Sequence, residues 1–253
     1  MKREEGCPGR EPALLVEGRV ELLGRILHSS NATFLVRLDD GGDGSDAGGG
    51  GGDGSRDPAW AVYKPEAGER PLVDFEPGLY RRERAAYLLS EYLAWDIVPP
   101  TVIRDDCPLG IGSLQWFIEG DPREHYFTLY ADSPQTHRAL SQIALFDCIA
   151  NNTDRKSGHV LRGHDGHVWG IDHGLCFSAD FKLRTVIWDF AGDAIPAALL
   201  RDISPLADAV PANVVELLDD EEVSALQRRV RRLLREGVLP ADRTGMRYPW
   251  PLV

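Results

Sequence analysis

Short apolar runs separated by polar turns dominate the first 120 residues. Residues 14–38 hold two such runs on either side of a polar turn at 28–32, a pattern typical of a β-hairpin. Residues 60–64 and 113–118 are two more strand-like runs. Apolar side chains at helical spacing predict one amphipathic helix over 80–93. The pattern therefore indicates an antiparallel sheet with one inserted helix.

The second half of the chain has a helical period at both ends. Residues 136–150 and 219–236 each place apolar side chains on one face, and Gly237 follows the second helix as a stop signal. Between them, residues 159–162 and 167–171 are short apolar strands around an Asp-Gly turn. The sequence thus predicts an α+β protein with a sheet-rich N-lobe at 12–118 and a mainly helical C-lobe at 119–253.

A glycine- and aspartate-rich segment interrupts the N-lobe at 40–57. It holds no aliphatic side chain larger than alanine, so burial cannot offset the entropy of ordering it, and we expect a disordered insert. A calcium-binding loop of the EF-hand type is disfavoured because the spacing to a glutamate at the twelfth position is absent.

Composition narrows the class of partner. The 253 residues carry a formal net charge of −12, which disfavours nucleic acid as a ligand but leaves room for a single nucleotide. No apolar run is long enough for a transmembrane helix. Four widely separated cysteines form no CxxC pair, which argues against disulfides and zinc and suits the cytoplasm.

Two aspartates are the strongest candidates for chemistry. Asp154 lies in the polar loop that enters the first strand of the 159–171 hairpin, and Asp172 directly follows its second strand. Because the open ends of a hairpin lie side by side, the two carboxylates should converge although they are 18 residues apart. Such a pair suits a metal–nucleotide site in which one carboxylate orients an acceptor hydroxyl and the other holds the metal.

The N-lobe offers matching parts for a nucleotide. Lys64 ends a strand and could reach nucleotide phosphates, while Glu83 on the following helix could hold Lys64 extended. The turn that contains Ser29, Ser30 and Asn31 could cover the phosphates with its backbone N–H groups.

In this order, these segments resemble the phosphatidylinositol 3-/4-kinase-related superfamily, and most of all the type II phosphatidylinositol 4-kinases and their bacterial relatives. The matching segments span roughly residues 15–195: AVYKP (61–65), ERAAYLLSEYLAWDIVPPT (83–101), QWFIEG (115–120), NNTDRKSGHVL (151–161) and GIDHGLCF (170–177). The resemblance implies a bilobal kinase-like fold that binds ATP and Mg²⁺ or Mn²⁺ between its lobes. It also implies transfer of the γ-phosphoryl group to a hydroxyl.

The resemblance also implies individual roles. Lys64 would contact phosphates and pair with Glu83, Asp154 would be the catalytic aspartate with Arg155 as its companion, and Asp172 would bind the metal. The adenine-binding hinge would be formed by Gln115, Trp116, Phe117 and Ile118.

One position departs from the family pattern. Five residues after the catalytic aspartate the family has an asparagine that binds a second metal, and this chain has His159. As a metal ligand, an imidazole would favour Mn²⁺ over Mg²⁺. A strand histidine with no metal role is the alternative.

The acceptor stays open at this stage. Residues 178–191 should form the acceptor-side loop, in which Lys182 and Arg184 could bind an anionic head group and the aromatic residues could contact acyl chains or pack the C-lobe. An arginine cluster at 228–235 suits a solvated helix face or peripheral contact with anionic lipid. Three functions remain: a kinase for an inositol-like small molecule or lipid, a Ser/Thr protein kinase, and a nucleotide-binding pseudokinase.

Overall fold

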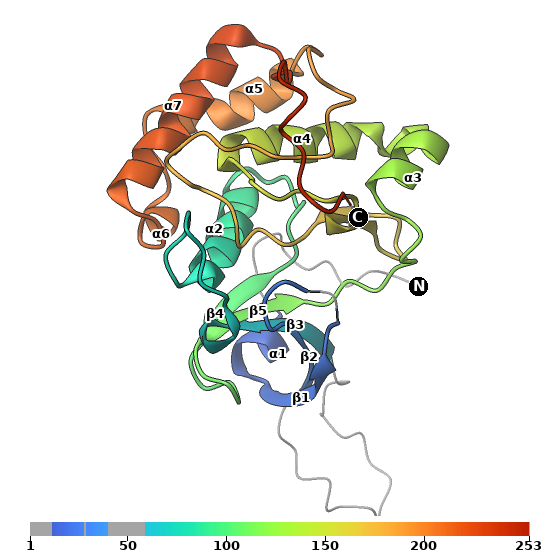
Figure 1. Cartoon of the computed structure of the whole chain (residues 1–253), viewed down its shortest axis with the longest axis vertical. Helices are drawn as coiled ribbons and strands as arrows, with labels where there is room; N and C mark the ends of the chain where they lie inside the picture. Colours follow the sequence, from blue (N-terminus) through green and yellow to red (C-terminus); the bar gives the residue numbers. More distant parts are fainter. Residues whose placement is uncertain (1–11, 28, 40–58, 253) are drawn as a thin grey trace, which may run out of the picture.

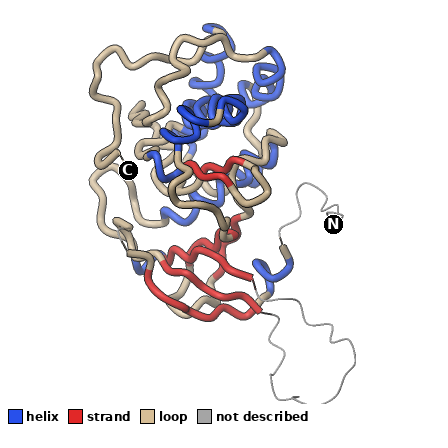
Figure 2. The backbone as a smooth tube through the Cα atoms, turned by 90° about the vertical axis from the view of Figure 1, so that its right-hand side faces the viewer, coloured by secondary structure: helices blue, strands red, loops and turns tan. Residues whose placement is uncertain are grey.

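The computed structural model describes residues 12–27, 29–39 and 59–252 (Figure 1). One antiparallel sheet has the strand order β1-β2-β3-β5-β4. Its strands are β1 (Arg19–Arg25), β2 (Phe34–Asp39), β3 (Ala59–Pro65), β4 (Thr101–Arg104) and β5 (Gly112–Trp116). Figure 2 shows this sheet at one end of the molecule and most of the helices at the other. The α+β class and the two-lobed architecture expected from the sequence are confirmed. The predicted insert at 40–57 lies outside the described residues.

The second lobe is built from helices around one small hairpin. Its α-helices are α3 (Tyr126–Asp132), α4 (His137–Ala150), α5 (Ala197–Ile203), α6 (Ala212–Val215) and α7 (Asp220–Glu236). Strands β6 (Val160–Arg162) and β7 (Val168–Gly170) pair antiparallel. Short 3₁₀ turns are η1 (Glu66–Gly68), η2 (Pro134–Thr136), η3 (Ser157–His159) and η4 (Ser204–Ala207). The predicted helices 136–150 and 219–236 and the predicted hairpin are therefore present within a few residues of their expected bounds.

The start of the sheet differs from the sequence-based expectation. Residues 14–38 were expected to form strands throughout, but α1 (Ala13–Glu17) comes first and β1 begins only at Arg19. Leu14 and Leu15 are both buried although they are adjacent in sequence. Neighbouring residues of a strand point to opposite faces, and β1 is an edge strand with a largely exposed face. A helical turn against the sheet buries both leucines.

Helix α2 (Leu79–Tyr92) joins β3 to β4 and lies between the two lobes (Figure 1). It packs against β4 and β5 on one side and contacts α6 on the other. Its buried residues Ala85 and Leu89 belong to the same hydrophobic core as α4 and α7. The sheet has a separate core around Val36, Ala61 and Tyr63. Thus α2 is N-lobe in sequence and packs against both the sheet and the C-lobe.

Most arginine side chains of helix α7 are exposed to solvent, and Arg229 is the exception. Arg229 is only 9% exposed, and its Nε donates to the carbonyl of Ile149 at 2.8 Å, at the end of α4. Burial lowers the pKa of Arg229 to about 10. Arg229 therefore fastens α7 to α4 from inside the lobe. Within the part of the chain that the structure describes, no helix is long and apolar enough to cross a membrane.

Candidate active site

Lys64 on β3 contacts acidic side chains from two other elements. Its Nζ lies 2.7 Å from Asp172 Oδ1 and forms a second, shorter ion pair with Glu83 of α2. Burial alone would lower the pKa of Lys64, but the charges of Asp172 and Glu83 outweigh burial and raise the pKa above its usual value. The structure thus brings together three side chains that come from a strand, a helix and a loop far apart in the sequence.

Asp172 follows β7 in a strained backbone conformation. Its φ is 61°, in the left-handed region that aspartate tolerates better than most residues. The next N–H, that of His173, donates to Glu83 Oε2 at 3.0 Å, so the same glutamate binds Lys64 and fixes the Asp172 turn. Desolvation raises the pKa of Asp172, but the Lys64 charge overrides it and keeps the pKa well below its usual range. Asp172 is therefore an anion whose side chain stays 45% exposed to the cleft.

Asp154 lies in the loop that follows α4. Asn151 ends α4 in the left-handed conformation, and the Asn152 side chain accepts the N–H of Asp154 at 3.0 Å. Burial raises the pKa of Asp154, and the Lys156 ammonium at 2.9 Å opposes that rise. Lys156 was not singled out from the sequence. The available signal was its position two residues after Asp154, which lets the side chain fold back over the carboxylate.

Arg155 serves to position this loop. Its side chain is completely buried, and two of its nitrogens donate to the Asp147 carboxylate at 2.9 Å each. A third nitrogen donates to the carbonyls of His159 at 3.0 Å and Ile171 at 2.6 Å. Arg155 thus ties the Asp154 loop, the end of β7 and α4 together without facing the cleft. Asp147 was missed in the sequence, where its one signal was a lone charge within the apolar run LFDCIA.

His173 completes this buried network. Its Nε2 lies 2.8 Å from Arg155 Nη2. An arginine only donates, so Nε2 must be the acceptor and the proton lies on Nδ1. Nδ1 is buried and has no partner among the described residues. Burial and then the Arg155 charge hold the pKa of His173 far below its ordinary value, so the ring is neutral.

His159 lies beside Asp172 at the end of η3. Its Nδ1 accepts the backbone N–H of Lys156 at 3.3 Å, and its Nε2 lies 3.1 Å from Asp172 Oδ2. Because Nδ1 accepts, the proton of the neutral ring lies on Nε2 and points to Asp172. Burial lowers the pKa of His159 to about 4. Among the described residues no three His, Cys, Asp or Glu side chains form a cluster that could hold a metal by themselves.

The hairpin turn near the cleft is tied to the loop after β3. Ser29 shares a hydrogen bond with Thr33 at 2.8 Å, and the Asn31 side chain accepts the N–H of Arg70 at 2.9 Å. The side chain of Ser30 is exposed. The Asn31 side chain therefore links the turn to the loop after β3.

The predicted hinge residues Gln115, Trp116, Phe117 and Ile118 lie at the end of β5 and directly after it. Gln115 and Trp116 lie in β5, between β3 and β4, and the buried Gln115 amide donates to Thr101 at 2.9 Å. The N–H of Phe117 donates to the carbonyl of Trp60 at 3.0 Å. The N–H of Phe117 is therefore already taken up by the sheet.

The apolar side chains of residues 178–191 mostly pack in the C-lobe core. Ile187 and Phe190 are buried in the C-lobe core, 3% and 7% exposed. Lys182 pairs with Asp74 at 3.2 Å. These contacts favour the structural role of the apolar residues in 178–191 over contact with acyl chains.

The Arg155–Asp147 pair generates a stability prediction. Replacing Asp147 by alanine leaves a buried guanidinium without its counter-charge, and we expect the free energy of unfolding to fall by about 3–5 kcal/mol. Chemical denaturation monitored by circular dichroism measures the change. The double variant Asp147→Leu/Arg155→Met should lose less, because no uncompensated charge remains; a larger loss than in Asp147→Ala would contradict the assignment.

The buried neutral His173 predicts a pH dependence. The pKa of His173 lies lower in the folded than in the unfolded protein, so the unfolded state binds more protons below pH ~6.5 and stability falls as pH falls. His173→Gln should remove about 1.5 kcal/mol of the loss between pH 6.5 and 5. The measurement is denaturant unfolding at several pH values. His164→Gln in the exposed hairpin turn is the matched control, and an equal effect there would refute the assignment.

Two individual proteins are similar to this chain. Protein Rv2133c of Mycobacterium tuberculosis is 37% identical over an alignment that covers 95% of this chain and 95% of that protein. A solved structure titled "The structure of hydra Fam20 with sugar" covers 88% of this chain and 86% of its own chain, with 12% identity and a TM-score of 0.49.

A family comparison covers most of the residues described above. The family Phosphatidylinositol 3- and 4-kinase matches residues 79–235, more than half of the chain. The match includes Glu83 on α2, Asp154 in its loop and Asp172 after β7. This chain belongs to the phosphatidylinositol 3- and 4-kinase family.

Proposed function

We propose that this chain transfers the γ-phosphoryl group of ATP to a hydroxyl group of an inositol-like small molecule or lipid. The observation that carries the proposal is the double contact of Lys64 with Glu83 and Asp172. It brings together one cation and one half-exposed carboxylate, the two groups that phosphates and a divalent metal would need. Membership of the kinase family supports the same reaction class.

The donor set fits a nucleotide-bound metal. Mg²⁺ usually takes one or two protein carboxylates and completes its shell with phosphate oxygens and water. Asp172 offers such a carboxylate with 45% of its side chain exposed. A bound divalent ion would supply charge neutralisation at the phosphates. Lys64 would bind phosphate oxygens while Glu83 holds it extended, and Ile118 would offer its backbone to adenine.

Asp154 is our candidate for handling the acceptor hydroxyl. Burial raises its pKa and so makes its carboxylate a better proton acceptor than an exposed aspartate. Lys156, 2.9 Å away, keeps the carboxylate charged and places an ammonium next to the path of the transferred group. Arg155 and Asp147 would hold the loop that carries Asp154 and leave its side chain free to face the acceptor.

Nucleotide binding and turnover should separate between the two aspartates. With Mg²⁺, ATP at 100 times its dissociation constant should stabilise the protein by about 2.7 kcal/mol, read as a rise in melting temperature. Asp172→Ala should abolish the metal-dependent shift, whereas Asp154→Asn should keep it and lose ATP consumption in the presence of myo-inositol or phosphatidylinositol vesicles. Asp132→Asn on the exposed end of α3 serves as control. The absence of a shift with either Mg²⁺ or Mn²⁺ would reject the proposal.

That assay also separates the remaining acceptors. Transfer to a protein substrate without transfer to inositol compounds would identify a protein kinase. A protein that binds ATP and Mg²⁺ but consumes no ATP with any acceptor would be a pseudokinase, and the histidine at position 159 is the residue that motivates this outcome.

His159 has a sharper test of its own. In the structure its Nε2 proton points to Asp172 and its Nδ1 accepts a backbone N–H. To bind a metal, Nε2 would have to lose that proton, so we expect Asp172 to be the protein ligand and His159 to orient it. Pulsed electron paramagnetic resonance of the Mn²⁺–ATP complex should then show no directly bound nitrogen. A nitrogen coupling that vanishes in His159→Asn would instead establish the histidine as a ligand.

A further inference from the structure

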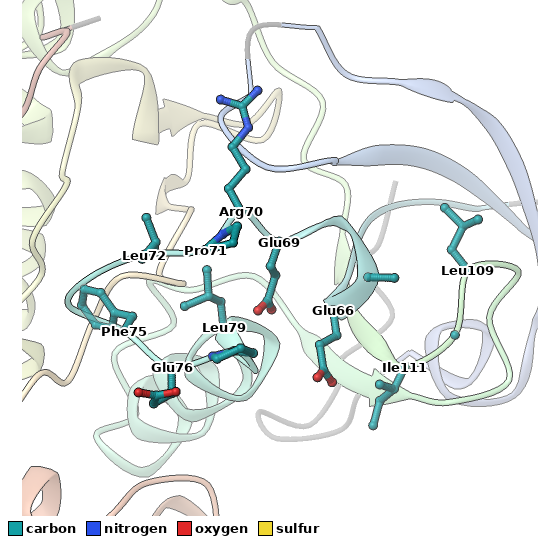
Figure 3. A pocket seen from close by; sticks show the side chains of 13 residues that line it. Glu66, Glu69, Arg70, Pro71, Leu72, Phe75, Glu76, Leu79, Leu109 and Ile111 are labelled. Carbon is teal, nitrogen blue, oxygen red and sulfur yellow. The ribbon is translucent and has the colours of Figure 1, made fainter.

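A second cavity lies outside the cleft, between the loop after β3 and the turn between β4 and β5 (Figure 3). Its volume is about 670 Å³, within the range of small-molecule sites. The apolar part of its lining comes mainly from Leu72, Phe75, Leu79, Leu109 and Ile111. Leu72, Leu109 and Ile111 are 36–41% exposed, which is unusual for large aliphatic side chains on the same concave surface.

The charged part of the lining is acidic. Glu66, Glu69 and Glu76 line the cavity together with one base, Arg70. Figure 3 shows the Arg70 guanidinium extending to the opposite side from the carboxylates of Glu66 and Glu69. Within the described part of the chain neither Glu66 nor Glu76 has an ion-pair partner. The cavity therefore combines an apolar wall with two carboxylates that have no counter-charge.

The cavity is lined by residues that are close in sequence to both Lys64 and Glu83. Glu66 follows Lys64 by two residues, and its N–H donates to the carbonyl of Ile111 at 2.9 Å. Glu69 accepts the N–H of Gly78, the residue before α2, at 2.8 Å. Leu79 is the first residue of α2 and lies four residues, about one turn, before Glu83. A molecule in the cavity would touch the end of β3 and the start of α2 at once.

We propose that this cavity binds a small cationic amphiphile, a primary amine or guanidinium with an aromatic or aliphatic body. The cation would pair with Glu66 and Glu76, and the apolar body would cover Phe75, Leu79 and Ile111. The two acidic side chains favour a cation over an anion, and the volume of about 670 Å³ favours a small molecule over a large flat partner. By bridging the β3 loop and the start of α2, the ligand would hold α2 in the position that pairs Glu83 with Lys64.

The test uses the full chain without nucleotide, so its outcome is independent of phosphotransfer. The probe is 3-phenylpropylamine, with 3-phenylpropanol as its neutral counterpart, and binding is measured by saturation-transfer NMR titration. We expect the amine to bind more tightly than the alcohol. Glu66→Gln/Glu76→Gln should weaken the amine about three- to tenfold, because two partly exposed ion pairs are lost, and leave the alcohol unchanged. Glu17→Gln/Asp132→Asn removes two exposed charges elsewhere and should change neither.

Two further measurements keep the proposal falsifiable. Ile111→Lys places a tethered ammonium in the cavity and should prevent amine binding. Hydrogen exchange should show added protection at the first turns of α2 when the amine binds wild type, and none in the double glutamine variant. Equal binding of amine and alcohol, an unchanged amine affinity in the double glutamine variant, or protection confined to other segments would each overturn the proposal.

Discussion

The buried ion pair between Arg155 and Asp147 holds together the segments that carry Asp154 and Asp172. Arg155 and Asp147 have no solvent exposure, and burying two charges is favourable only when every donor finds an acceptor. Here the guanidinium meets that requirement with the Asp147 carboxylate, the carbonyls of His159 and Ile171, and the His173 ring. Those acceptors belong to the two segments that carry Asp154 and Asp172. The distance between the two candidate catalytic carboxylates is thus set by a group that neither of them touches.

The second constraint is the sharing of Glu83 between two tasks. One of its oxygens binds Lys64 and the other accepts the N–H of His173. Glu83 is only 2% exposed, so these two contacts replace the water that its carboxylate loses on burial. Displacing α2 would therefore release the lysine and loosen the turn of Asp172 together. The placement of the Lys64 side chain and the conformation of the Asp172 turn therefore depend on the same residue.

The sequence predicted what depends on periodicity and short-range spacing. Helices α2, α4 and α7 and the β6–β7 hairpin follow from apolar period and turn chemistry, and hairpin geometry alone brought Asp154 and Asp172 to one end. The convergence of Lys64, Glu83 and Asp172 needed the family resemblance as well. The sequence-based prediction was wrong where contacts between distant residues determine the local structure. Helix α1 forms because an edge strand cannot bury two adjacent leucines. In the sequence Asp147 is a lone charge in an apolar run, and its partner Arg155 lies against it only in the folded chain.

Lys64, Glu83 and Asp172 lie on different elements, and this has a consequence for movement between the two lobes. Ala85 and Leu89 of α2 are in the C-lobe core, and the same helix also packs against β4 and β5 of the sheet. Lys64 lies on β3, Glu83 lies on α2, and Asp172 follows β7 in the C-lobe. Moving the sheet away from the C-lobe would therefore break the contact between Lys64 and Asp172. The ion pairs of Lys64 thus oppose separation of the two lobes.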